Sequence, residues 1–314
     1  MPTETEYTRT EETFVSAGVT CAATVYRPNR ATPAGRAPVV VMAHGFAGVR
    51  GLRLPAYADV FAAAGYVVVL FDYRFFGDSE GEPRQLLDVA SQLADWRAAI
   101  AFARTVDVAD PDTVVAWGTS FAGGHVITTA GSGERLAAII AQVPHVSGPA
   151  AVRATGIRRA LRIAPSALAD TVAAALHRAP RYVPSIGPEG SPAVMSAPGA
   201  EEAFERLVTE SGLRRGDHPE TVAARIALRI GLYSPARSAS RVRCPALIQV
   251  ALGDTIAPAA AATRAARAIP DATVLSYEGG HFDPYVEPLF SSVVADQLAF
   301  LRTVAPADSS APGA

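Results

Sequence analysis

Short apolar runs alternate with longer segments of helical periodicity along most of the chain. Continuous apolar runs predict strands that are covered on both faces, at 38–43, 66–71, 113–117 and 136–143. Segments with apolar residues at helical spacing separate them, at 54–64, 85–104 and 121–130. Repeated strand–helix units predict an α/β fold with a mostly parallel central sheet and helices on both faces.

The two ends of the chain extend this pattern. Residues 13–16 and 20–26 are rich in β-forming residues on either side of a turn at 17–19, which predicts an antiparallel entry pair. Near the C-terminus the alternation has four more elements, with strands at 246–252 and 273–277 and helices at 259–268 and 288–304.

From about 148 to 240 the alternation stops. This stretch is rich in Ala, Arg and Pro, it has no strand-like run, and it shows helical patches at 149–162, 165–178, 200–211 and 219–229. An insertion at the carboxyl edge of a parallel sheet covers the ligand crevice. We therefore expect 1–147 and 241–304 to form an α/β core, 148–240 a helical cap (lid), and 305–314 a disordered tail.

The segment 118–124 has the sequence GTSFAGG and lies between a predicted strand and a predicted helix. A serine among small residues at such a turn is typical of a nucleophile elbow, in which Oγ projects above the sheet edge. The motif G-x-S-x-G is met here as G-x-S-x-A, with Ala122 in the last position. A glycine-rich loop with an incidental serine is the alternative, so Ser120 needs partners elsewhere in the chain.

Two later strand ends carry such partners. His281 follows the predicted strand 273–277 in the sequence GGHFDPY, and Asp254 follows the strand 246–252. A histidine that activates a serine, oriented by an acid, is the arrangement of nucleophilic catalysis. The alternatives are a surface-loop histidine and a helix N-cap aspartate. The competing strand end, after 136–143, has His145 and no carboxylate, which favours Asp254.

Other titratable residues near these motifs have structural interpretations. Asp283, two residues after His281, is expected to organise its own loop, and His125 lies on the helix after the serine. His177 and His218 fall in the predicted cap.

An oxyanion formed at Ser120 requires two N–H donors. The N–H of Phe121, at the start of the new helix, is one. The second is expected from Phe46, because the sequence His44-Gly45-Phe46-Ala47-Gly48 follows a buried strand and its glycines let the backbone approach a ligand. A glycine-rich turn without this role is the alternative.

Composition restricts the class of protein. The 314 residues are 49% hydrophobic and 18% charged, with a net charge of −2, which is typical of a globular protein and gives no reason to expect nucleic acid as a partner. All 28 basic residues are arginine. Cys21 and Cys244 are far apart and are expected to be unpaired buried thiols. The polar N-terminal residues do not resemble a signal peptide, and no apolar run reaches the length of about 18 residues that spans a membrane. We therefore expect a cytoplasmic protein without membrane contact.

The order Ser120, Asp254, His281 resembles that of the α/β-hydrolase superfamily, over roughly 14–302 with only the cap unmatched. The segment 71–81 is similar to the D-x-R-G-x-G-x-S connection of that superfamily, although Phe75 replaces its usual glycine; its Asp72 and Arg74 are interpreted as structural. The elbow and GGHFDPY are most similar to the dienelactone-hydrolase, peptidase-S15-like and small bacterial esterase branches.

The resemblance implies a serine hydrolase that cleaves a carboxylic ester or thioester through an acyl-enzyme, with no metal or organic cofactor. Cleavage of a C–C bond beside a ketone or of an amide by the same triad stays open, as does a triad-bearing ligand receptor or pseudoenzyme. The expected partner is a small, partly apolar acyl substrate. Binding residues and a choice between monomer and homodimer do not follow from the sequence. Solvated helix faces explain the cap arginines better than substrate carboxylate recognition does, at Arg153, Arg158, Arg159 and Arg162.

Overall fold

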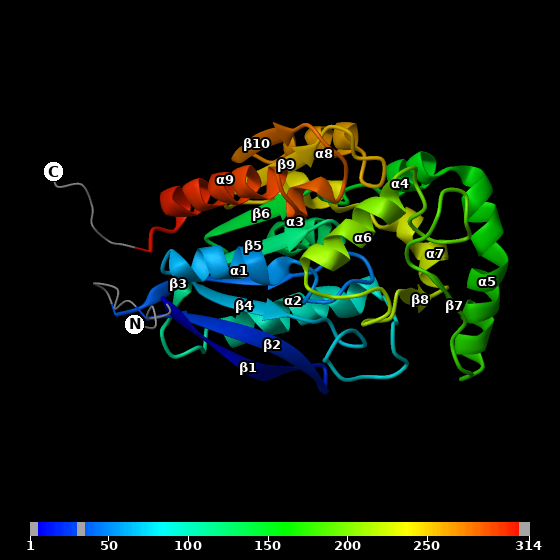
Figure 1. Cartoon of the computed structure of the whole chain (residues 1–314). Coiled ribbons are helices and arrows are strands. Elements are labelled where there is room, and N and C mark those ends of the chain that lie inside the picture. Colours follow the sequence, from blue (N-terminus) through cyan, green and yellow to red (C-terminus); the bar gives the residue numbers. More distant parts are fainter. Residues whose placement is uncertain (1–5, 30–34, 308–314) are drawn as a thin grey trace.

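The computed structural model describes residues 6–29 and 35–307 and contains a central sheet of eight strands (Figure 1). Strands β1 and β2 form an antiparallel hairpin, β2 is antiparallel to β4, and the other pairs are parallel. In spatial order the strands are β1 (Tyr7–Ser16), β2 (Val19–Pro28), β4 (Val67–Phe71), β3 (Ala37–Ala43), β5 (Ala109–Thr119), β6 (Ala138–Gln142), β9 (Ala246–Ala251) and β10 (Ala272–Tyr277). The predicted α/β class with a mostly parallel sheet is confirmed.

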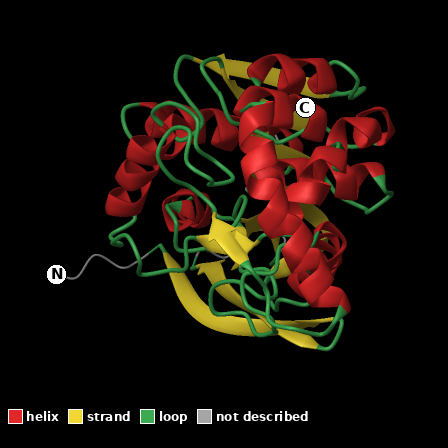
Figure 2. Ribbon diagram, turned by 90° about the vertical axis from the view of Figure 1, so that its right-hand side faces the viewer, coloured by secondary structure: helices red, strands yellow, loops and turns green. Residues whose placement is uncertain are grey.

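Helices cover both faces of this sheet (Figures 1 and 2). On one face Tyr57 of α1 packs on Trp117 of β5, whose indole N–H donates to Gln297 of α9. On the other face Trp96 of α2 packs edge-on against Phe71 of β4. The helices that flank the sheet are α1 (Leu54–Ala63), α2 (Val89–Ala103), α3 (Phe121–Gly131), α8 (Ala259–Ala266) and α9 (Leu289–Val304). Because both faces are covered, every residue of β3, β4, β6 and β9 is buried.

Two predicted boundaries near the N-terminal half need correction. The first strand begins at Tyr7 and not at residue 13, since the polar segment before Thr13 pairs with β2 along its whole length as the edge of the sheet. Helix α2 begins at Val89 and not at residue 85, because the Asp88 carboxylate accepts a hydrogen bond from the Ser91 N–H at 2.9 Å and caps the helix there.

The chain between β6 and β9 forms a separate group of elements beside the carboxyl ends of the strands (Figure 1). They are α4 (Gly148–Thr155), α5 (Ile157–Ala175), β7 (Tyr182–Pro184), α6 (Ala200–Glu210), β8 (Thr221–Ala223), α7 (Ile226–Arg229) and the 3₁₀ helices η1 (Ile230–Leu232) and η2 (Pro235–Arg241). A further 3₁₀ helix, η3 (Asp283–Tyr285), follows β10.

The sequence pattern was wrong about this segment in two places. Strands β7 and β8 pair antiparallel where no strand was expected, and β8 replaces the start of the predicted helix 219–229. Three residues are too few to show alternation, and β8 does not alternate, since Val222 and Ala223 are both buried. The break expected before Pro165 is absent; Gly156, at φ 90°, separates α4 from α5 instead.

The last residues differ from the expected disordered tail at 305–314. Ala305 and Ala307 are buried, and Ala307 lies against Gly65, so the prediction is wrong for this part. Residues 308–314 lie outside the described part of the chain.

None of the helices in the described residues combines the length and the apolar character needed to cross a membrane. Cys21 is buried and Cys244 half-buried, and neither is in a disulfide.

A buried ion pair links the strand ends to α2. The Arg74 guanidinium donates to the Asp95 carboxylate at 2.6 and 2.7 Å and to Ser16 Oγ at 2.6 Å. Asp95 has no exposed surface and Arg74 is 7% exposed. This agrees with the structural role expected for Arg74.

Removing Asp95 is therefore expected to destabilise the fold. Asp95→Ala leaves the Arg74 cation buried without its partner, which costs about 3–5 kcal/mol of unfolding free energy in comparable sites. Urea unfolding followed by circular dichroism measures the loss. Asp112→Ala is the matched control, because its ion pair with Arg135 is exposed and its removal changes stability by about 0.5 kcal/mol or less. Equal losses in the two variants would contradict the prediction.

Candidate active site

Ser120 connects β5 to α3 through a strained turn. Its φ is 55° and its ψ is −116°, a region that non-glycine residues rarely adopt. The turn closes so tightly that a Cβ on Gly118 would lie 2.3 Å from the Ala122 carbonyl oxygen. A Cβ on Gly124 would lie 2.2 Å from the carbonyl oxygen of His145. The small residues predicted for an elbow are thus required by backbone contact.

The structure brings the three residues predicted as a triad into one chain of hydrogen bonds. Ser120 Oγ lies 2.9 Å from His281 Nε2, and His281 Nδ1 lies 2.6 Å from Asp254 Oδ2. A carboxylate only accepts, so Nδ1 carries the proton and Nε2 is free to accept the serine proton. All three residues are buried, at 5–8% exposure.

The second oxygen of Asp254 is held by the backbone. Asp254 Oδ1 accepts hydrogen bonds from the N–H groups of Ile256 and Ala257 at 2.8 and 2.7 Å. These bonds fix the carboxylate plane and aim Oδ2 at His281. Asp254 therefore orders the turn before α8 with one oxygen and contacts His281 with the other; it is not a helix N-cap, because that position in α8 is Pro258. Asp283 behaves as expected of a loop residue, since its Oδ2 accepts from the Gly280 N–H at 2.7 Å.

The loop after β3 passes directly beside the serine. A Cβ on Gly45 would lie 2.9 Å from Ser120 Cβ and 3.3 Å from Oγ, so only glycine lets this backbone come so close. The rings of Phe46 and Phe121 meet edge to face at 5.7 Å. The Phe121 N–H begins α3 and has no acceptor within the helix. Both residues predicted for the oxyanion site thus lie at Ser120.

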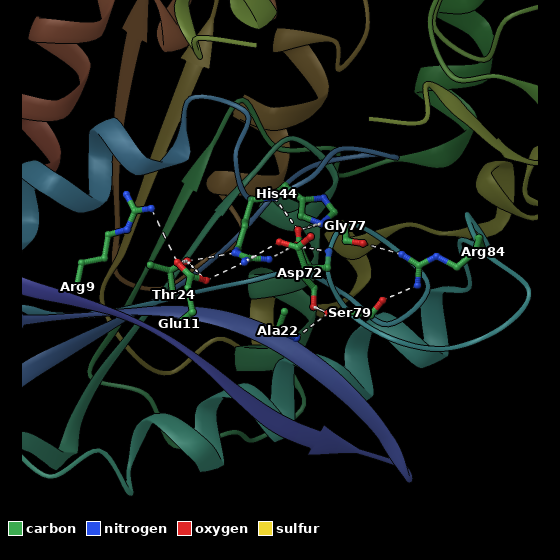
Figure 3. A network of polar contacts seen from close by, with 11 residues as sticks. Arg9, Glu11, Ala22, Thr24, His44, Asp72, Gly77, Ser79 and Arg84 are labelled. Atoms are coloured by element: carbon green, nitrogen blue, oxygen red, sulfur yellow. Dashed lines mark hydrogen bonds and ion pairs between the residues drawn. The ribbon is translucent and has the colours of Figure 1, made fainter. Parts of the chain in front are cut away.

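A polar network behind this loop holds it in place (Figure 3). The buried Asp72 carboxylate accepts from the Arg50 backbone N–H at 2.7 Å and also pairs with the Arg50 guanidinium. Arg50 in turn contacts Glu11 of β1 at 2.8 Å. Gly77 packs so closely that a Cβ would lie 2.2 Å from Asp72 Oδ2. Asp72 therefore supports the loop that carries Phe46, in line with its predicted structural role.

Two small pockets flank Ser120, and Phe46 and Met195 border both. One, of about 40 Å³, reaches His281 and is walled by Leu52, Leu54, Phe204, Leu207 and Phe282. The other, of about 60 Å³, reaches His145 and is walled by Ala151, Val152, Val194, Ile230 and Ile256. Many of these side chains come from the segment between β6 and β9. These wall residues could not be predicted from the sequence, because apolar residues that line a pocket have the same pattern as those that pack a helix.

Comparison with known proteins identifies the family. A model of the X-Pro dipeptidyl-peptidase (S15) family matches residues 17–264. The chain belongs to this family. The quorum-quenching protein AidA of Acinetobacter baumannii is 44% identical over 93% of this chain and 94% of its own. An uncharacterized 31.7 kDa Escherichia coli protein from the traX-finO intergenic region is 29% identical over 84% and 90% of the two chains.

Solved structures agree with the fold of this S15 family member. The α/β-hydrolase GrgF from Penicillium sp. sh18 is 21% identical, with a TM-score of 0.78 over 95% of this chain and 99% of its own. The structure of DcsB in complex with a substrate analogue is 20% identical, with a TM-score of 0.79 over 95% and 100%. The prediction that the chain is an α/β-hydrolase enzyme, similar to the peptidase-S15-like branch of that superfamily, is confirmed.

Two further histidines of this hydrolase are buried and neutral. His125 Nδ1 lies 2.7 Å from the Tyr233 hydroxyl and Nε2 lies 2.9 Å from Gln92 Oε1, and burial lowers its pKa to about 3. Burial also lowers the pKa of His145 to about 4. His125 has the structural role expected of it.

Among the described residues no group of three or more His, Cys, Asp or Glu is placed to hold a metal ion.

The cap arginines differ among themselves. Arg153, Arg158 and Arg162 are exposed, as expected of solvated helix faces. Arg159 is half-buried and donates to the Ser196 carbonyl at 3.0 Å, so it joins α5 to the loop before α6. None of the four borders the pockets beside Ser120.

The close approach of Gly45 to the serine leads to a test. Gly45→Ala forces the Ser120 side chain or the loop to move, and a misplacement of about 1 Å costs about 100-fold in rate. The rate at which a fluorophosphonate probe labels Ser120 measures this loss. In the control Gly51→Ala, on the same loop, the new Cβ meets only Leu213 at 3.9 Å, and labelling should change less than about twofold. Unchanged labelling of Gly45→Ala would refute the inferred contact.

The buried state of His125 predicts a pH dependence of stability. Its pKa is about 3 when folded and about 6.5 when unfolded, so the unfolded chain binds one more proton between these values. The unfolding free energy therefore falls as pH drops from about 6.5 toward 3. His125→Gln should reduce this slope by about 1.4 kcal/mol per pH unit. Urea unfolding at pH 7, 6 and 5 measures the slopes; identical slopes for His125→Gln and the parent would contradict the assignment.

Proposed function

We propose that this protein hydrolyses carboxylic esters or thioesters through a covalent acyl-enzyme on Ser120. The observation that carries the proposal is the continuous hydrogen-bonded chain Ser120–His281–Asp254 at the mouth of two apolar pockets. Serine, histidine and aspartate in these roles perform acyl transfer on several unrelated folds. The thiohydrolase aneE of Aspergillus aculeatus, 40% identical over 34% of this chain and 34% of its own, is consistent with thioester chemistry.

In the proposed mechanism His281 Nε2 takes the proton of Ser120 Oγ, and Oγ attacks the acyl carbon. The N–H groups of Phe46 and Phe121 stabilise the tetrahedral oxyanion, each contributing about 3 kcal/mol to the lower barrier. His281 then protonates the leaving oxygen or sulfur, and water, activated in the same way, releases the acid. Asp254 keeps the proton on Nδ1 and stabilises the imidazolium.

The walls of the two pockets favour an ester over a peptide substrate. A dipeptidyl-peptidase must bind the ammonium group of its substrate, for which a carboxylate is the natural partner. No acidic or arginine side chain of the described residues borders either pocket; the polar members are histidine, serine, threonine and tyrosine. A small, partly apolar acyl group fits these walls better. Amide or C–C cleavage remains the second candidate because the same triad serves both.

We also propose that residues 148–240 act as a cap over the site. Met195 borders both pockets, and Phe204 and Leu207 of α6 face the pocket that contains His281. The cap thereby shields the reacting groups from water and shapes the acyl site, while the core provides the triad.

Inactivation of the proposed nucleophile tests the proposal. Ser120→Ala should abolish fluorophosphonate labelling, and His281→Ala and Asp254→Asn should each lower the kcat for p-nitrophenyl acetate and its thioester analogue by about 10³–10⁴-fold. Ser276→Ala, an exposed serine on β10, is the matched control and should react like the parent. Absence of labelling in the folded parent would refute a serine hydrolase, and labelling without turnover of any ester or amide would favour a receptor.

A further inference from the structure

His145 lies beside the proposed nucleophile without taking part in the triad. It follows β6, is 6% exposed, and borders the same pocket as Ser120. Its backbone N–H donates to the Ser120 carbonyl oxygen at 2.8 Å, so its position is tied to the elbow. Apart from Ser120, it is the one polar side chain among the described residues that line this pocket.

Aromatic rings on two sides fix the orientation of this imidazole. Tyr233 stacks on it with an interplanar angle of 12° and a centroid distance of 6.1 Å, and Phe121 contacts it at 5.2 Å. Tyr233 is itself held by its hydroxyl, which lies 2.7 Å from His125 Nδ1 and 3.1 Å from Thr128 Oγ1. The ring is thus held between the elbow helix and the segment before η2.

One ring nitrogen of His145 lacks a hydrogen-bond partner. Nε2 is buried and has no partner among the described residues. Burial keeps the ring neutral at pH 7, because it lowers the pKa to about 4. A neutral imidazole has one donor and one acceptor nitrogen. Leaving such a buried polar atom unpaired opposes folding unless a ligand satisfies it.

We propose that His145 Nε2 accepts a hydrogen bond from the substrate, and that the substrate is an ester whose acyl or alcohol part bears an amide N–H or a hydroxyl group. The inference rests on the proposed function, since it places that donor in the pocket next to the carbonyl that Ser120 attacks. His145 then determines specificity: in a pocket with otherwise apolar walls, a substrate without the donor leaves Nε2 unpaired.

Matched substrates that differ in one donor test this role. Ethyl N-acetylglycinate and ethyl 4-oxopentanoate differ by N–H against CH₂ on the acyl side. The acetates of 2-acetamidoethanol and 5-hydroxypentan-2-one differ in the same way on the alcohol side. Ethyl 3-hydroxybutyrate and ethyl butyrate test a hydroxyl. The ratio of kcat/KM within each pair is compared between the parent and His145 variants, which cancels intrinsic differences in ester reactivity.

At least one pair should favour the donor-bearing ester about tenfold more in the parent than in His145→Leu. His145→Asn should also lose the preference, because its side chain ends at the position of Nδ1. His145→Gln should retain part of it, because its amide oxygen reaches the position of Nε2. Ser276→Ala, at an exposed position on β10 away from the pocket, is the control, and its ratios should stay at the parent values.

The outcomes separate this inference from the proposed function. If Ser120 is labelled and the esters are cleaved, but no pair shows a ratio that depends on His145, the specificity role is refuted and the hydrolase stands. If the folded parent is neither labelled nor active, the proposed function itself fails. If His145→Leu does not fold, the comparison of His145→Asn with His145→Gln decides, and equal ratios in the two overturn the proposal.

Discussion

The left-handed backbone of Ser120 is the constraint on which the rest of the site depends. A φ of 55° at a residue with a Cβ costs about 1–3 kcal/mol, so the surroundings must enforce it. Here the Ser120 N–H donates to the Gln142 carbonyl at 2.9 Å, and the Ser120 carbonyl accepts from the His145 N–H at 2.8 Å. Both partners belong to β6 and the loop that follows it. The neighbouring strand thus holds the turn in the conformation that points Oγ at His281, and the loop after that strand places His145 beside Ser120.

The main features of the fold and the placement of the proposed triad side chains followed from the sequence, because both depend on local signals. A parallel strand that is buried on both faces is an unbroken apolar run, and the residue after it lies at the carboxyl edge. That rule was sufficient to place Ser120, Asp254 and His281 at one edge of the sheet, where their side chains form one hydrogen-bonded chain. The position of the Phe46 loop beside Ser120 followed from its glycine neighbours in the same way.

The features that escaped prediction depend on contacts between distant segments. Met195 and Phe204 have no pattern that separates a pocket wall from a helix interior, and only their approach to the core reveals it. Phe75 is the reverse case: it stands where the superfamily has glycine and still adopts a φ of 73°. Hydrogen bonds from its N–H to the Glu80 carbonyl and from the Gln85 N–H to its carbonyl hold that backbone. The hydrogen bonds of the surrounding loop thus hold a phenylalanine in a backbone conformation that normally favours glycine.

The site divides its chemistry between two parts of the chain. The proposed triad residues and the glycine-flanked loop follow strands of the sheet, whereas much of the apolar wall comes from the segment between β6 and β9. Tyr233 joins the two parts, because it comes from the inserted segment and contacts both His125 on the elbow helix and His145 at the pocket. The inserted segment is thus anchored beside the elbow, and it contacts His145, whose Nε2 has no hydrogen-bond partner in the described structure.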